Sequence, residues 1–124
     1  MKQKLLLIDD DQTLLDALET VLRAVGYDVV SVQSGQAGLR LLRDTPVHLV
    51  LLDLQLHGVH GSEVLQRIKE ASPNLPVIIM TAFCQAEMRE KVERRGAIAV
   101  ICKPFARQAL LSLIADTLAK APDG

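Results

Sequence analysis

Four apolar runs of the sequence each end in a polar or charged side chain, and this pattern constrains the fold more than any other feature. The runs cover residues 4–8, 49–52, 77–80 and 98–102. The side chains that follow them are those of Asp9 and Asp10, Asp53, Thr81 and Lys103. Apolar runs of this length between helical segments are typical of buried parallel strands. Ligands of an open parallel sheet bind just beyond the carboxyl ends of its strands, so we expect these side chains to gather at one edge.

This set of side chains favours a particular chemistry. Magnesium binds hard oxygen ligands, and one or two carboxylates suffice because the ion keeps several waters. A carboxylate can also act as a nucleophile and form an aspartyl-phosphate. An ammonium and a hydroxyl offset charge on a transferring phosphoryl group. The pattern therefore indicates a site for a magnesium ion and a phosphoryl group.

Helical segments alternate with the apolar runs. Apolar residues at helical spacing predict a first helix over 12–25, with Gly26 after it as a C-cap. Ser34 and Ser62 are expected to be the N-caps of the second and third helices, which reach Arg43 and Ala71. The fourth helix is expected over 85–95 and the fifth over 107–120, with a further strand over 27–32. The alternation predicts an α/β fold with a doubly wound, five-stranded parallel sheet. The stripe expected to face the core in the fifth helix consists of Ala109, Leu110, Leu113, Ile114 and Leu118.

Composition is consistent with one soluble domain. A chain of 124 residues suffices for a single core, and with only three aromatic residues that core must be aliphatic. We assign residues 1–120 to the domain and 121–124 to a loose tail or the start of a linker. A net charge of −1 without a Lys/Arg cluster argues against direct nucleic-acid binding, and no segment has the length or apolarity of a membrane span. Cys84 and Cys102 lack metal-type spacing and are interpreted as reduced, packed cytosolic thiols rather than a redox pair.

Five short motifs, in this order and spacing, resemble those of response-regulator receiver domains, the CheY-like phosphoacceptor modules of two-component signalling. They cover essentially the whole chain. The motifs are Leu5-Leu6-Leu7-Ile8-Asp9-Asp10, Leu49-Val50-Leu51-Leu52-Asp53-Leu54 with Gly61, Met80-Thr81-Ala82, Gly96-Ala97 and Lys103-Pro104-Phe105. The resemblance implies the strand order 2-1-3-4-5 of a CheY/flavodoxin-like fold.

The resemblance also implies roles for the acidic residues. Asp53 is expected to be the phosphorylated residue. Asp10 and Asp53 would bind Mg²⁺ (or Mn²⁺) directly, Asp9 through water, and the Gln55 carbonyl would be a further ligand.

On the other side of the site, Lys103 and Thr81 would contact the phosphoryl oxygens, with Ala82 beside them at a switch position. The bond before Pro104 is expected to be cis. The usual aromatic residue three positions before the lysine is replaced by Val100, so we expect the readout of phosphorylation to differ or to weaken.

The family's partners follow from the same resemblance. A histidine kinase or a phosphotransfer protein would donate the phosphoryl group. An output domain or downstream protein would bind the face formed by the fourth helix, the fifth strand and the fifth helix. A homodimer would form through the fifth helix. The domain would be cytoplasmic and would turn over no external substrate, so we do not class it as an enzyme.

Three alternatives remain open. A phosphatase of the haloacid dehalogenase type could use Asp9 as nucleophile and Asp11 as acid/base, although helix capping is the role we favour for Asp11. A pseudo-receiver would have the same fold and would serve as an interaction module without being phosphorylated. His57 and His60, three residues apart, could form a metal pair, and His57 also stands where the family usually has proline.

Overall fold

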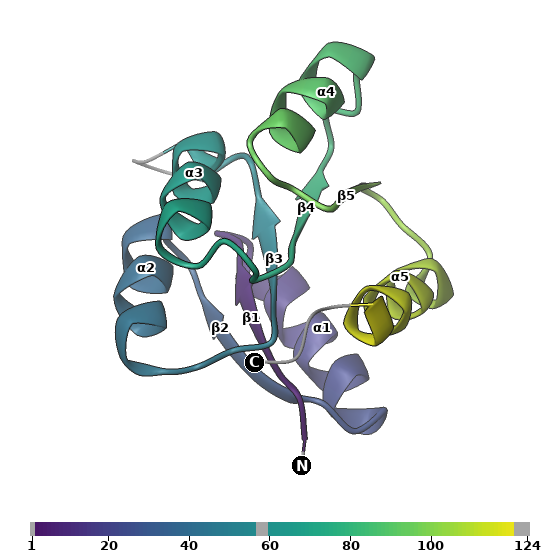
Figure 1. Cartoon of the computed structure of the whole chain (residues 1–124). Helices are drawn as coiled ribbons and strands as arrows, with labels where there is room; N and C mark the ends of the chain where they lie inside the picture. Colours follow the sequence, from purple (N-terminus) through teal and green to yellow (C-terminus); the bar gives the residue numbers. More distant parts are fainter. Residues whose placement is uncertain (1, 57–59, 121–124) are drawn as a thin grey trace.

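Five parallel strands form one sheet with helices on both faces in the computed structural model, which describes residues 2–56 and 60–120 (Figure 1). The strand order is β2-β1-β3-β4-β5, with β1 and β3 at the centre. The predicted doubly wound α/β fold and its strand order are therefore confirmed. The strands are β1 (Lys4–Ile8), β2 (Asp28–Val32), β3 (Leu49–Asp53), β4 (Val77–Thr81) and β5 (Ala99–Cys102).

Each strand is followed by a helix, so all four connections between successive strands are βαβ crossovers. The helices are α1 (Gln12–Ala24), α2 (Gly35–Asp44), α3 (Gly61–Ala71), α4 (Ala86–Arg94) and α5 (Arg107–Lys120). These bounds agree with the predicted segments to within one or two residues. The assignments that involve His57 and the tail 121–124 lie outside the described residues.

The core is divided by the sheet into two aliphatic clusters. Leu5 and Leu7 of β1 face the cluster that contains the buried side chains of α1 and α5. Leu6 and Ile8 face the opposite cluster, which includes buried residues of α3 and α4 and partly buried leucines of α2. Successive side chains of a strand point to opposite faces. A strand covered on both faces therefore has to be apolar, as β1, β3 and β4 are apart from the terminal residues Lys4, Asp53 and Thr81.

The helix ends confirm most of the predicted caps and correct one. The Asp11 and Ser34 side chains accept hydrogen bonds from the first-turn amides of α1 and α2, and Gly26 after α1 has a φ of 105°. The prediction of Ser62 as the cap of α3 is wrong. The cap is His60, whose Nδ1 accepts from the Ser62 N–H at 3.1 Å, and α3 begins at Gly61. A ring nitrogen here replaces the hydroxyl oxygen that usually fills this position.

The two C-terminal helices differ in how much of their surface they bury. Only Val92 of α4 is buried, as its polar sequence predicts. In α5 the buried residues are Leu110, Ile114 and Thr117, with Leu113 and Leu118 partly buried. Ala109, expected in the core stripe, is exposed, and Thr117 takes a core position because its hydroxyl donates to the Leu113 carbonyl at 2.7 Å. Among the described residues, no helix combines the length and apolarity needed to cross a membrane.

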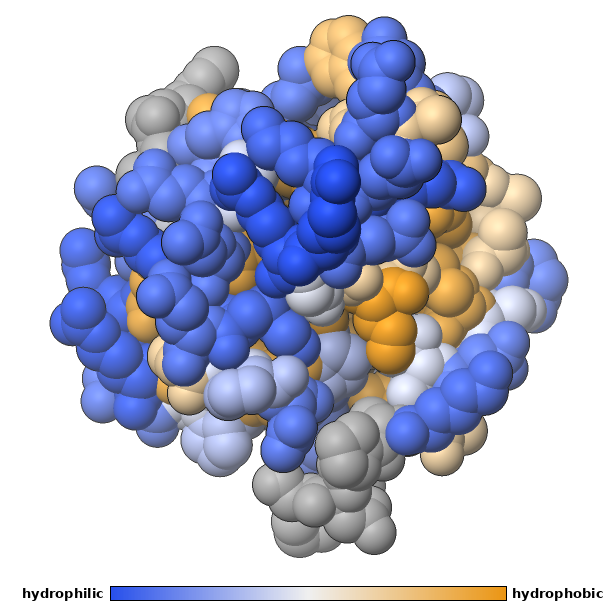
Figure 2. All heavy atoms as spheres, turned by 45° about the horizontal axis from the view of Figure 1, so that its top comes forward, coloured by the Kyte–Doolittle hydropathy of each residue, from blue (hydrophilic) through white to orange (hydrophobic). Residues whose placement is uncertain are grey.

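One face of the molecule is partly apolar. Strand β5 lies at the edge of the sheet, and all four of its residues are partly exposed. Ile98, just before it, is 52% exposed. Figure 2 shows the resulting apolar surface between the polar helix α4 and helix α5. This is the surface at which the sequence predicts a partner.

Candidate functional site

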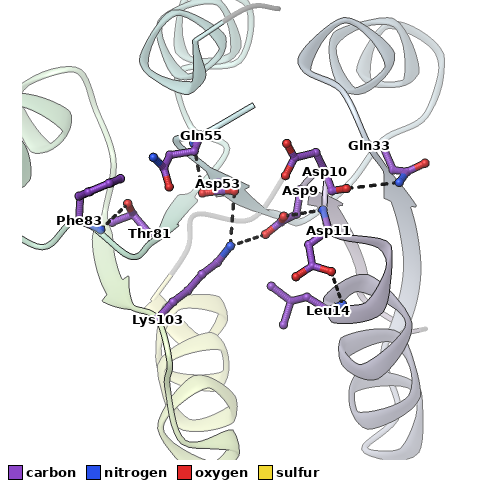
Figure 3. A network of polar contacts seen from close by, with 10 residues as sticks. All are labelled: Asp9, Asp10, Asp11, Leu14, Gln33, Asp53, Gln55, Thr81, Phe83 and Lys103. Atoms are coloured by element: carbon purple, nitrogen blue, oxygen red, sulfur yellow. Dashed lines mark hydrogen bonds and ion pairs between the residues drawn. The ribbon is translucent and has the colours of Figure 1, made fainter. Parts of the chain in front are cut away.

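Three carboxylates meet at the carboxyl ends of the two central strands. Asp9 and Asp10 directly follow β1, and Asp53 is the last residue of β3. The register pairs Ile8 with Leu52, so the two strands end side by side. A carboxylate oxygen from each of the three aspartates lies within 4.8 Å of the other two (Figure 3). The acidic cluster predicted from the sequence is present.

Lys103 brings an ammonium group to this cluster from the other half of the sheet. It follows β5, and its N–H donates to the Thr81 carbonyl at 2.8 Å. Its Nζ lies 2.8 Å from Asp9 Oδ2 and 3.4 Å from Asp53 Oδ2. Burial acts to lower the pKa of this ammonium, but the hydrogen bond to Asp9 and the charges of both aspartates more than offset it, so the pKa is raised. Lys103 therefore stays protonated and bridges two carboxylates.

Asp53 is held in place by its own loop. Its Oδ1 accepts a hydrogen bond from the Gln55 N–H at 3.2 Å. The Gly61 N–H donates to the Leu54 carbonyl at 3.1 Å, which ties the end of β3 to the start of α3. Only glycine fits at position 61, because a Cβ there would lie 2.5 Å from Leu54 Cα and 2.6 Å from the Asp53 carbonyl oxygen.

The environment of Asp53 opposes its ionisation. The residue is only 4% exposed, and this burial is the largest cause of its raised pKa. The charge of Asp9 raises the pKa further, while the Gln55 amide and Lys103 act to lower it. Lys103 compensates charge on Asp9 and Asp53, and the three carboxylates together offer hard oxygen donors. Such a donor set fits a divalent cation such as Mg²⁺.

The pocket around the cluster is open to solvent and is formed mainly by the β1–α1 and β3–α3 connections. Gln55 is part of its wall, as the predicted metal site requires. The residues that line it are Asp9, Asp10, Asp11, Asp53, Leu54, Gln55, Leu56, His60 and Lys103.

Thr81 lies at the end of β4 but does not face this pocket. It is fully buried, and its Oγ1 accepts a hydrogen bond from the Phe83 N–H at 3.0 Å. Figure 3 shows this bond on the far side of Lys103 from Asp9. Ala82 is exposed in the loop that follows. The structure therefore brings the three aspartates and Lys103 together, and it leaves the Thr81 hydroxyl hydrogen-bonded to the loop that follows β4.

Asp11 is used for structure. Its Oδ1 accepts from the Leu14 N–H at 3.2 Å, which makes it the N-cap of α1, and its own N–H donates to Asp9 Oδ1 at 3.0 Å. The helix-capping role favoured by the sequence is confirmed. A phosphatase that used Asp11 as its acid/base group would have to give up this cap.

Two further expectations concern the β5 side. The Lys103–Pro104 peptide bond is cis, as predicted. Val100, where the family usually has an aromatic residue, is partly buried and packs against the cluster that contains Val92 of α4. It pairs in register with Ile79 of β4.

His60 is a pocket residue whose position the sequence did not fix. Its Nδ1 accepts from Ser62, so only the other ring nitrogen remains for a ligand or for water. The alternative of a metal pair with His57 involves a residue that lies outside the described ones. A histidine just before a helix is a weak sequence signal, since Ser62, two residues later, offers a more usual cap.

The expectation of two free thiols is wrong. Cys84 and Cys102 form a disulfide with their Cα atoms 5.9 Å apart. Cys84 lies in the loop after Thr81, and Cys102 is the residue paired with Thr81 in the β4–β5 register. The linear spacing of 18 residues gives no sign of this pairing. It arises because the chain leaves β4, forms α4 and returns beside β4 as β5.

Comparisons with known proteins agree with this geometry. The family described as the response regulator receiver domain matches residues 5–115. The response regulator protein FleR of Pseudomonas aeruginosa is 36% identical over 93% of this chain, which spans only 24% of FleR. Sporulation initiation phosphotransferase F of Bacillus subtilis is 33% identical over 85% of both chains.

A solved structure gives the same answer. The CheY-like receiver domain protein of Methanospirillum hungatei superposes with a TM-score of 0.93 at 28% identity, covering 97% of this chain and 96% of that one. The family match spans nearly the whole chain, and the acidic cluster with its bridging lysine lies where the motifs of the sequence require it. The chain belongs to the response regulator receiver domains of two-component signalling.

Proposed function

We propose that Asp53 is the phosphoacceptor of this receiver domain. The observation that carries the proposal is the Lys103 ammonium, which lies between Asp53 and Asp9 at 3.4 and 2.8 Å. An oxygen of the Asp53 carboxylate attacks the phosphorus of a phosphohistidine on a kinase or phosphotransfer protein. The phosphorus–nitrogen bond breaks, and the imidazole leaves with a proton. Asp53 becomes an acyl phosphate.

The proposed roles of the other residues follow from their charges. Asp9, Asp10 and the Gln55 carbonyl, with Asp53, would hold Mg²⁺ or Mn²⁺, which when bound neutralises charge on the phosphoryl oxygens. Lys103 already contacts two of the carboxylates and would pair with a phosphoryl oxygen once Asp53 is modified. The domain thus promotes its own modification and has no separate substrate to turn over.

The proposed response runs through the β4–α4 loop. For the Thr81 hydroxyl to reach a phosphoryl group on Asp53, it must leave the Phe83 N–H that it now binds. That exchange would bias a two-state equilibrium between an inactive and an active arrangement of the loop and α4. Because α4 buries one side chain, it can shift at small cost.

The partner surface is the apolar face over β5 between α4 and α5. Ile98 is 52% exposed beside an edge strand whose residues are all partly exposed. An output domain, a downstream protein or a second copy of the chain would bind this face, and a shift of α4 would change its shape. Val100 lies in the middle of β5 without an aromatic ring, so packing of α4 on Val100 has to transmit the shift. We place this soluble domain in the cytoplasm, where kinases of this class act.

The test is the intact mass after incubation with Mg²⁺ and acetyl phosphate. We expect a single phosphoryl adduct on the wild-type chain and none on Asp53→Asn. The matched control is Asp44→Asn, which changes an exposed aspartate outside the pocket and should be modified like wild type. An unmodified wild-type chain, beside a receiver that is modified in the same buffer, would contradict the proposal and favour a phosphorylation-independent pseudo-receiver.

A further inference from the structure

The Cys84–Cys102 disulfide joins the two segments that carry Thr81 and Lys103. Cys84 lies three residues after Thr81, in the connection between β4 and α4. Cys102 is the last residue of β5 and immediately precedes Lys103. Between them the chain forms all of α4, so the bond fixes the start of this excursion to its end.

The bond also lies against the backbone of Thr81. Cys84 Sγ is 3.4 Å from the Thr81 carbonyl oxygen, which also accepts the Lys103 N–H at 2.8 Å. A single peptide oxygen is thus in contact with the loop cysteine and with the backbone of the lysine. A displacement of Cys84 would therefore also displace the backbone of Thr81 and of Lys103.

The bridged structure has the Thr81 hydroxyl engaged away from Asp53. Its Oγ1 accepts from the Phe83 N–H at 3.0 Å, one residue before the tethered Cys84. When the hydroxyl turns toward Asp53, the Phe83 N–H loses this acceptor, which favours a movement of the backbone at Phe83. The disulfide limits this movement, because residue 84 is attached to the edge of the sheet.

We propose that the Cys84–Cys102 pair is a redox-modified regulatory site, in which the disulfide restrains the β4–α4 loop and its reduction favours the phosphorylated arrangement. This inference rests on the proposed function of Asp53. The reductant is a dithiol. One thiolate of the dithiol attacks a sulfur of the protein disulfide, which forms a mixed disulfide and releases one cysteine. The second thiolate of the dithiol then attacks the mixed disulfide and releases the other cysteine. Two electrons and two protons pass to Cys84 and Cys102, and the dithiol leaves as a disulfide.

Two observations fit a reversible disulfide better than a permanent structural one. Both cysteines are partly exposed, and Phe83, which precedes Cys84 in the chain, is 52% exposed, so a dithiol can approach. In the reducing compartment in which we place the domain, disulfides are usually transient or redox-sensing. Coupling between two sites is reciprocal, so phosphorylation must in turn make the bond easier to reduce.

The experiment compares the oxidised and the reduced chain for binding of beryllofluoride, a phosphoryl analogue, in the presence of Mg²⁺. Oxidised protein is identified by a mass lower by two hydrogen atoms and by the absence of alkylation, and reduced protein is kept in dithiothreitol. We expect beryllofluoride to bind the reduced form about fivefold or more tightly, a typical coupling between sites. The double variant Cys84→Ser/Cys102→Ser should bind like the reduced wild type and ignore dithiothreitol.

A second measurement does not depend on any variant. The fraction of bridged protein is determined in a dithiothreitol redox buffer with and without beryllofluoride, and its equilibrium must shift by the same factor. Equal affinities in the two forms, tighter binding by the oxidised form, or failure of the bond to form in oxidising buffer would each overturn the inference alone. An absence of beryllofluoride binding in every form, the serine variant included, would overturn the proposed function as well.

Discussion

The two halves of the site are built differently. At the ends of β1 and β3, Asp9 is fully buried and Asp53 is 4% exposed, and their strands are covered by helices on both faces. At the ends of β4 and β5, Thr81 is buried but its loop is exposed, and β5 is an edge strand with every residue partly exposed. Lys103 contacts carboxylates of the first half from the second.

This difference indicates which part of the domain can respond to phosphorylation. The central strands hold their carboxylates in a core that is close-packed and resists movement. In the edge half, β5 and α4 bury few side chains, so they can move for little free energy. Under the proposed function, phosphorylation at the central strands is therefore read out at the edge strand and α4. Removing parts of each half in turn tests this division.

The largest effect on stability is expected from the disulfide. Cys84→Ser/Cys102→Ser should lower the free energy of unfolding in oxidising buffer by about 3 kcal/mol, because the bond closes a loop of 18 residues. Chemical denaturation measures the loss, and hydrogen exchange should locate it in α4 and β5. Wild type in dithiothreitol serves as the control and should resemble the variant. If hydrogen-exchange protection were lost at β1 and β3 instead, the division of the site into a rigid half and an edge half would be contradicted.

The second largest loss of stability is expected when the charge that links the two halves of the site is removed. Lys103→Met is expected to cost about 2 to 3 kcal/mol, because Asp9 and Asp53 then lack their cation and the lysine side chain is only 23% exposed. Added Mg²⁺ should recover part of this loss, as seen in the denaturation midpoint. Lys120→Met at the exposed end of α5 is the matched control. An equal cost in the two variants would show that the ammonium does not compensate the cluster.

A steric change at the rigid half should have a somewhat smaller effect. In Gly61→Ala the added methyl would meet the backbone of Leu54 and Asp53, at a cost of about 1 to 2 kcal/mol. It should also slow phosphorylation, because the clash falls on the peptide of Asp53. Gly38→Ala is the control, since its methyl would meet the flexible end of the Ile8 side chain. Thermal unfolding and phosphorylation rates of both variants decide whether backbone contact is the cause.

The smallest effect should come from neutralising Asp53, and its sign depends on pH. The folded-state pKa is raised above the ordinary 3.8, so as pH rises from that value the unfolded state loses its proton first. The stability contributed by Asp53 is therefore lost as pH rises through the folded-state pKa. Without Mg²⁺, Asp53→Asn should melt a few degrees higher than wild type at neutral pH and equally below pH 3.8. A lower melting point at neutral pH would mean that Lys103 outweighs burial.

Most of the rigid half could be predicted from the sequence. The aliphatic runs of β1 and β3 and the aspartates that end them are local features, and parallel strands place their carboxyl ends together. The positions of Asp9, Asp10, Asp53 and Lys103 follow from these rules and the family motifs.

The features that the sequence did not reveal depend on three-dimensional proximity or on a choice between neighbours. His60 caps α3 in place of Ser62, although the serine has the more usual side chain for a cap. Thr117 takes a core position through a hydrogen bond to its own helix. The cysteines meet because of the register of β4 and β5, which their spacing does not encode. Of these features, the disulfide lies in the edge half, where β5 and α4 bury few side chains.

The central claim is that the phosphoryl group is received on Asp53, in the rigid half. The most direct test treats the phosphorylated chain with borohydride, which converts an aspartyl-phosphate to homoserine, and identifies the changed residue by peptide mass spectrometry. We predict homoserine at position 53 alone. Homoserine at position 9, or an adduct on any other residue, would contradict the account.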